Sequence, residues 1–160
     1  MLNTWPIPGS LGAYGVFIDQ NDDAWIADYG SSQIIHLNSV GAFVGAFPTV
    51  EPCYEVLVAP DGTIWASSTA GNVWHHTAAG ALLGGFPAFP GGGGSFGLEM
   101  MSDGTLWVSD VNVPILWKFD QVGTPLASFP TSGLDVNIAT LRRWRIGQNY
   151  CQANPNSTGQ

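Results

Sequence analysis

The sequence predicts an all-β fold: a partial β-propeller built from four-stranded antiparallel blades. A short turn followed by Trp occurs three times, and the three Trp residues lie 40 and 42 positions apart. A repeat period of about 40 residues with four short apolar segments per unit is typical of propeller blades. An aromatic-Pro pair closes each unit, and charged residues make up only 10% of the chain, which disfavours helices. The turns are Asn21-Asp22-Asp23-Ala24-Trp25, Asp61-Gly62-Thr63-Ile64-Trp65 and Asp103-Gly104-Thr105-Leu106-Trp107, and the pairs are Trp5-Pro6, Phe47-Pro48, Phe86-Pro87 and Phe129-Pro130.

Each repeat divides into four segments of strand length, rich in β-branched and aromatic residues. The Asp-Gly turn suits a tight hairpin because Gly tolerates a positive φ, and Asn21-Asp22 is a weaker substitute. The expected strands are 14–19, 24–28, 33–37 and 42–47 in the first blade, 54–59, 63–68, 72–76 and 81–86 in the second, and 96–101, 105–110, 115–119 and 125–129 in the third.

The two ends of the chain do not complete a blade. Trp5-Pro6 matches the close of a fourth strand, so the chain starts inside a blade. Residues 135–144 resemble 110–119, which favours a third strand at 141–146; a rival alignment makes 134–139 an innermost strand. We therefore assign residues 1–147 to the propeller portion and the Pro/Gly/Asn-containing residues 148–160 to a polar tail or linker.

The charge balance excludes some classes of partner. The net charge is −8 with only four Lys and Arg residues, so we expect no nucleic-acid binding. No run of about 18 apolar residues is present, so we expect no membrane span. An acidic surface suits a divalent cation or a cationic ligand instead. Cys53 and Cys151 are too few for a disulfide scaffold and leave the cellular compartment open.

The first blade, GVFIDQNDDAWIADYGSSQIIHLNSVGAFVGAFP, resembles the NHL-repeat, SMP-30 and virginiamycin-B-lyase group of β-propellers. The Asp-Gly-x-aliphatic-Trp turn and the Gly-x-aliphatic-x-x-Phe fourth strand carry this resemblance over roughly residues 5 to 146. It implies a ring of about six or seven blades, of which this chain holds about three. The ending NPNSTG resembles a junction to a C-terminal domain in secreted bacterial proteins, which implies an extracellular or periplasmic location, although this chain has no signal peptide.

Candidate metal ligands come from the innermost strands. Alternate residues of a strand point to opposite sides, so each innermost strand has two sets of residues, which we call its two parities. One parity, which includes Val16, Val56 and Leu98, is expected to pack between blades. The other is expected to border the central channel. Glu55 and Glu99 place carboxylates on the channel parity, and carboxylates suit hard cations such as Ca²⁺ or Mg²⁺, which the resembling lactonases and lyases hold there. Two ligands fall short of the usual six, so solvated rim acids are the competing interpretation.

Other candidate groups are interpreted as structural. His36, His75 and His76 lie in third strands, away from the channel, and we expect them to pack within the blades. Gly93-Gly94-Ser95-Phe96-Gly97 matches a nucleophile motif, but that motif needs a strand before it and a helix after it, so we expect no catalytic residues there.

These observations favour a non-catalytic propeller portion that acts as a binding or scaffold module. The alternatives are part of a metal-dependent lyase or lactonase, and a half-propeller that self-assembles. The expected partners are missing blades of the same protein or a second copy that completes a six-blade ring, together with a small-molecule or carbohydrate ligand.

Overall fold

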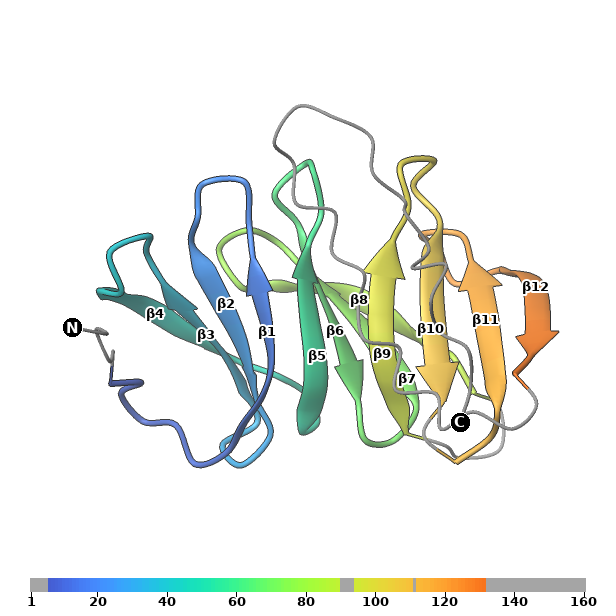
Figure 1. Cartoon of the computed structure of the whole chain (residues 1–160), viewed down its shortest axis with the longest axis horizontal. Coiled ribbons are helices and arrows are strands. Elements are labelled where there is room, and N and C mark those ends of the chain that lie inside the picture. The colour runs from blue at the N-terminus through green and yellow to red at the C-terminus, as the bar shows by residue number, and fades with distance from the viewer. Residues whose placement is uncertain (1–5, 90–93, 111, 132–160) are drawn as a thin grey trace, which may run out of the picture.

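The computed structural model describes residues 6–89, 94–110 and 112–131, which form three four-stranded antiparallel sheets in chain order (Figure 1). Within each sheet, the strands follow one another in sequence, and we call the sheets blades 1, 2 and 3. Blade 1 comprises β1 (Ala13–Ile18), β2 (Ala24–Asp28), β3 (Gln33–Leu37) and β4 (Phe43–Pro48); blade 2 comprises β5 (Cys53–Val58), β6 (Ile64–Ser68), β7 (Asn72–His76) and β8 (Leu82–Pro87); blade 3 comprises β9 (Ser95–Met100), β10 (Leu106–Asp110), β11 (Ile115–Phe119) and β12 (Pro125–Pro130).

The predicted fold class is confirmed, and strand bounds differ from the expected ones by at most one residue at either end. The turns also form as expected, since Asp22, Gly62 and Gly104 adopt positive φ values of 62°, 84° and 80°. No helix occurs in the described ranges, and hence none that is long and apolar enough to cross a membrane.

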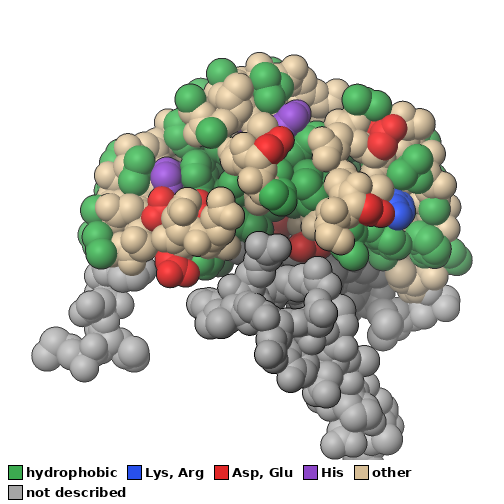
Figure 2. Space-filling model, turned by 90° about the horizontal axis from the view of Figure 1, so that it is seen from above, with side chains coloured by type: hydrophobic (Ala, Val, Ile, Leu, Met, Phe, Trp, Pro, Cys, Tyr) green, Lys and Arg blue, Asp and Glu red, His purple; other side chains and the backbone are tan. Residues whose placement is uncertain are grey.

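The blades pack face to face, as blades around a propeller axis do. Strand β5 lies against β1 and β2, and β9 lies against β5 and β6. The second-strand tryptophans stand in matching places, because Trp25 pairs with His36, Trp65 with His75 and Trp107 with Lys118. One apolar cluster fills the space between blades 1 and 2, and another fills the space between blades 2 and 3. Figure 2 shows the described residues as an arc seen from above.

This packing corrects the expected channel parity. Leu57 shares the parity assigned to the channel, but it is buried in the cluster between blades 2 and 3. Phe17, on the same parity, packs against both clusters, and Gly15 lies against the backbone of β5. The reason is geometric: both faces of a blade meet neighbouring blades, so alternate residues of an innermost strand face two blades rather than a blade and the channel.

The aromatic-Pro pairs fasten each blade to the next. A Cβ built on Gly80, in the β7–β8 turn, would overlap the ring of Phe47, and a Cβ on Gly123, in the β11–β12 turn, would overlap the ring of Phe86. Both glycines have positive φ values, 82° and 87°. The repeated glycine therefore serves as a turn residue and as the site on which the preceding blade's phenylalanine packs.

The outer part of blade 1's free face is covered. Ile26, Ile35 and Leu37 are buried there, with Ile7 packed against them. The inner edge is open, where Val16 is 52% exposed although its equivalent Val56 is 0% exposed. The expected strand at 141–146, its rival at 134–139, the tail at 148–160 and Trp5 all lie outside the described residues.

Candidate functional site

Each innermost strand carries a β-bulge close to its start. In β1 the pairing with β2 shifts between Ala13 and Gly15, which makes Tyr14 the extra residue. In β5 the pairing with β6 shifts between Cys53 and Glu55, which makes Tyr54 the extra residue. A bulge removes a residue from the ladder and redirects its side chain, and bulges are frequent beside functional sites.

The two bulged tyrosines meet a third at one end of the blades. Tyr29 directly follows β2, and its ring centroid lies 5.8 Å from that of Tyr14 and 5.4 Å from that of Tyr54. The rings of Tyr14 and Tyr54 meet edge to face at 5.2 Å. We call Tyr14, Tyr29 and Tyr54 the tyrosine platform. Tyr14 is 60% exposed and Tyr29 41%, so the platform presents aromatic surface to solvent.

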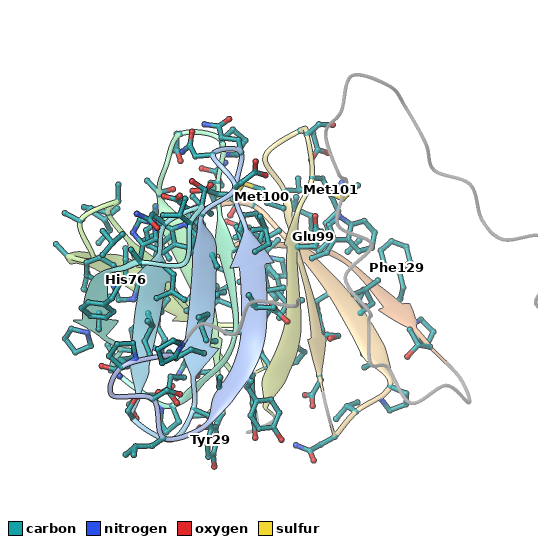
Figure 3. The ribbon with its side chains drawn as sticks, turned by 60° about the vertical axis from the view of Figure 1, so that its left-hand side comes forward. Tyr29, His76, Glu99, Met100, Met101 and Phe129 are labelled. Atoms are coloured by element: carbon teal, nitrogen blue, oxygen red, sulfur yellow. The ribbon has the colours of Figure 1, made fainter. Side chains whose placement is uncertain are left out.

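Burial raises the pKa of the Tyr54 hydroxyl, and the neighbouring Tyr29 and Tyr14 hydroxyls raise it further. The Tyr54 hydroxyl therefore stays neutral at physiological pH. Figure 3 shows Tyr29 at the end of the blades opposite to Met100 and Met101.

Carboxylates lie at the same end of the strands as the platform. Asp28, the last residue of β2, is buried and accepts hydrogen bonds from Leu11 N at 3.0 Å and Ser31 Oγ at 2.7 Å. Burial acts to raise the pKa of Asp28, but these hydrogen bonds outweigh it and hold the pKa below its usual value. Asp28 is therefore a charged carboxylate one residue from Tyr29.

Glu51, just before β5, makes a similar network in blade 2. It accepts hydrogen bonds from Ser68 Oγ, from Asn72 Nδ2 at 3.0 Å and from Trp74 Nε1 at 3.3 Å. Burial opposes ionisation of Glu51, yet these three donors lower its pKa. The network ties the connection before β5 to β6 and β7, so its main role is structural.

The two predicted metal ligands occupy different repeat positions. Glu55 pairs with Ser67, and its Oε1 lies 3.0 Å from where a Cβ on Gly15 would stand, between β1 and β5. Glu99 pairs with Trp107, on the face of blade 3 that turns away from blade 2. In the ranges 6–89, 94–110 and 112–131, no three His, Cys, Asp or Glu residues are grouped so as to hold a metal ion. The assignment of Glu55 and Glu99 to a cation stays a prediction.

All three histidines of the chain belong to third strands, as expected. His36 stacks on Trp25 and His75 stacks on Trp65, each with ring centroids 3.8 Å apart. His36 Nε2 also lies 2.9 Å from Asp23 Oδ2. His76 is buried, with Nδ1 3.3 Å from the carbonyl oxygen of Gly80.

Ser95, the centre of the nucleophile-like motif, begins β9 and is buried between blades. Its Oγ contacts the carbonyl oxygens of Asn72 at 2.9 Å and Ser68 at 3.2 Å. A serine at the start of a strand that bonds the backbone of the neighbouring blade links the two blades. This contact agrees with the structural interpretation of the motif.

The sequence analysis missed the tyrosine platform. Its members come from three segments, and the bulges that direct two of them have no clear sequence signature. The available signal was the shared repeat position of Tyr14 and Tyr54, each the second residue of an innermost strand.

Comparison with known proteins places the fold. No protein-family model and no curated protein matches the chain. Among solved structures, virginiamycin B lyase from Staphylococcus aureus is similar with a TM-score of 0.63 and 16% identity, over 74% of this chain and 41% of the lyase. A streptogramin B lyase gives a TM-score of 0.66 at 18% identity, over 75% and 41% of the two chains. A catalytically inactive virginiamycin B lyase with quinupristin, also from Staphylococcus aureus, gives 0.68 at 14% identity, over 82% and 45%.

These structural similarities show the fold alone, because the sequence identity to each of the three lyases is 18% or lower. The chain spans less than half the length of each of these lyases. Together with the three four-stranded sheets, they show that the chain has the fold of a partial β-propeller similar to that of virginiamycin B lyase.

Proposed function

We propose that this chain is a non-catalytic β-propeller binding module, and that its ligand is a small organic cation held on the tyrosine platform. The observation that carries the proposal is the convergence of Tyr14, Tyr29 and Tyr54 at one end of the innermost strands, with ring centroids 5.2 to 5.8 Å apart. Two of these side chains are directed there by bulges that recur at the same place in successive blades.

Aromatic faces and negative charge together favour a cation. A cation over a tyrosine ring gains about 0.5–1 kcal/mol at an exposed site, and the protein's charge of −8 concentrates cations near its surface. Asp28 supplies a local carboxylate next to Tyr29. Lys118 is the only Lys or Arg among the described residues, and it belongs to blade 3.

The contacts of the three histidines, which are the candidate acid-base groups, support the non-catalytic part of the proposal. His36 and His75 stack on tryptophans, and His76 is buried inside blade 2. A general base must reach the proton that it removes. The alternative function, part of a metal-dependent lyase or lactonase, is supported by the fold similarity to the lyases and by the carboxylates of Glu55 and Glu99.

The experiment is a calorimetric titration of the full chain with benzyltrimethylammonium, which joins a flat ring to a fixed positive charge. Tyr14→Ala should weaken binding about fivefold, because one cation–π contact of about 1 kcal/mol is lost. Tyr14→Phe should retain most of the affinity, since it keeps the ring. Phe43→Ala is the matched control: Phe43 is 48% exposed on β4, away from the platform, and its removal should leave binding unchanged.

Two other results would overturn the proposal. Equal binding of benzyl alcohol or of a neutral methyl glucoside would show that charge is irrelevant and the ligand class is wrong. Mg²⁺-dependent opening of quinupristin by the chain, lost in Glu55→Gln and Glu99→Gln, would instead establish the lyase alternative.

A further inference from the structure

In two of the three blades, the phenylalanine that closes the fourth strand stacks on the tryptophan of the second strand. In blade 1 the ring centroids of Phe47 and Trp25 lie 6.1 Å apart, and the angle between the ring planes is 19°. In blade 3 the centroids of Phe129 and Trp107 lie 5.2 Å apart, and the angle is 15°. The repeat therefore provides a place for a flat aromatic ring beside its tryptophan.

Blade 2 departs from this pattern. Its closing phenylalanine, Phe86, packs against Phe119 of blade 3, with ring centroids 5.2 Å apart and an interplanar angle of 44°. Trp65 keeps its stack with His75, at 3.8 Å. The phenylalanine that stands beside the tryptophan in blades 1 and 3 is thus turned towards the neighbouring blade in blade 2.

The consequence shows at Gly84. Gly84 pairs with His75, and Gly45 pairs with His36 at the same place in blade 1. A Cβ built on Gly45 would meet the Phe47 ring at 3.8 Å, whereas one built on Gly84 would meet no atom of the described residues within 4 Å, its neighbours in the chain aside. The same repeat position is therefore covered by a phenylalanine ring in blade 1 and open in blade 2.

A cavity of about 190 Å³ lies in this part of blade 2. Its lining includes Trp65, His75 and Gly84 and, from the β11–β12 turn of blade 3, Val122. Trp65 is 1% exposed, whereas Leu83 is 55% and Val122 82% exposed, so the tryptophan lies at the floor and the other two residues lie at the rim. We call this site the blade 2 cavity.

The lining favours a neutral ligand of limited size. None of the described residues that line the cavity is Asp, Glu, Lys or Arg. Burial lowers the pKa of His75 and outweighs the opposing charge of Asp61, so the imidazole is neutral at physiological pH. A charged ligand would therefore lose water without gaining an opposite charge. An apolar protein cavity of about 150 Å³ holds benzene, so this cavity has room for one ring or a fused pair.

We propose that the blade 2 cavity binds a neutral, planar aromatic molecule of the size of indole, whose ring takes the place beside Trp65 that a phenylalanine takes in the other blades. The side-chain oxygen of Gln121, which also lines the cavity, can accept a hydrogen bond from a ring N–H. The walls are the Trp65–His75 stack and a turn of the next blade, and such a slot disfavours benzyl compounds, whose tetrahedral carbon turns its substituent out of the ring plane. The site is separate from the tyrosine platform, because it is built from β6, β7, β8 and the β11–β12 turn.

The test is ¹H–¹³C NMR of the histidine rings in the full chain during titration with indole. The His75 signals, assigned with His75→Gln, should shift and saturate, because an aromatic ring beside the imidazole changes its chemical shifts. The His36 signals should stay in place, since Phe47 fills the equivalent site in blade 1. Shifts at both histidines, or no shift at His75 up to millimolar indole, would overturn the proposal.

Paired leucine variants locate the site. Leu83→Ala should weaken indole binding about fourfold, because it removes apolar contact at the rim. Leu126→Ala is the matched control: Leu126 occupies the same place in β12 and is 52% exposed, and its replacement should leave binding unchanged. Tyr14→Ala should also leave it unchanged, which separates this site from the tyrosine platform. Equal weakening by the two leucine variants, or loss of the His75 shift in Tyr14→Ala, would show that indole binds elsewhere and that the proposal is wrong.

Discussion

Replacing Gly80 by alanine isolates the contact that fastens blade 1 to blade 2. Gly80 has a φ of 82°, and an added Cβ would overlap the Phe47 ring. Gly62 is the matched control: its φ is 84°, but an added Cβ would meet only Ala78 Cβ, at 3.9 Å. Both substitutions therefore carry the cost of a left-handed alanine, about 1–2 kcal/mol, and only Gly80→Ala must also displace an aromatic ring.

Overpacking of this kind costs about 1–3 kcal/mol, so Gly80→Ala should lower the free energy of unfolding by about 2–5 kcal/mol and Gly62→Ala by about 1–2 kcal/mol. Urea unfolding followed by tryptophan fluorescence, at one protein concentration, measures both. Phe47→Leu in the Gly80→Ala background should recover part of the loss, because the smaller side chain leaves room for the methyl group. Equal losses for the two glycine variants, or no recovery with Phe47→Leu, would refute the account of blade packing.

Three further predictions concern stability and reactivity. Asp19 Oδ2 accepts a hydrogen bond from Trp25 Nε1 at 3.0 Å. Asp19→Ala should therefore lower the free energy of unfolding, measured in urea, by about 1–3 kcal/mol, because it leaves a buried N–H unpaired. A loss of stability no larger than that caused by Gln20→Ala, at an exposed position, would contradict this. Burial lowers the pKa of His76. The unfolded chain therefore binds more protons below about pH 6.5, and the free energy of unfolding should fall from pH 7 to pH 5, with a shallower fall in His76→Gln. Burial raises the pKa of the Cys53 thiol to about 11, so in Cys151→Ser a thiol reagent should react with the native protein only as fast as it unfolds.

The sequence predicted the fold well because its strongest signals are local. The turn before each Trp and the aromatic-Pro pair at the close of each fourth strand define a blade without reference to distant residues. The Trp pairings with His36, His75 and Lys118 then follow from hairpin register.

The site was harder to predict because it depends on where the strands face. Alternation along β5 suggested a channel-facing Leu57, but a blade packs on both sides, and Leu57 is buried. The bulge at Tyr54 also shifts the alternation within β5, so that Cys53 and Val56 belong to the same cluster although they are three residues apart. Neither effect can be read from residue types alone.

The central claim, a binding module with its ligand on the tyrosine platform, is tested most directly by aromatic ¹H–¹³C NMR during titration with benzyltrimethylammonium. The account predicts shifts of the Tyr14, Tyr29 and Tyr54 ring signals, assigned with single Tyr→Phe variants, while the His36 and His75 ring signals stay in place. The probe should not be converted to another compound. Shifts centred on other residues, or chemical conversion of the probe, would contradict it.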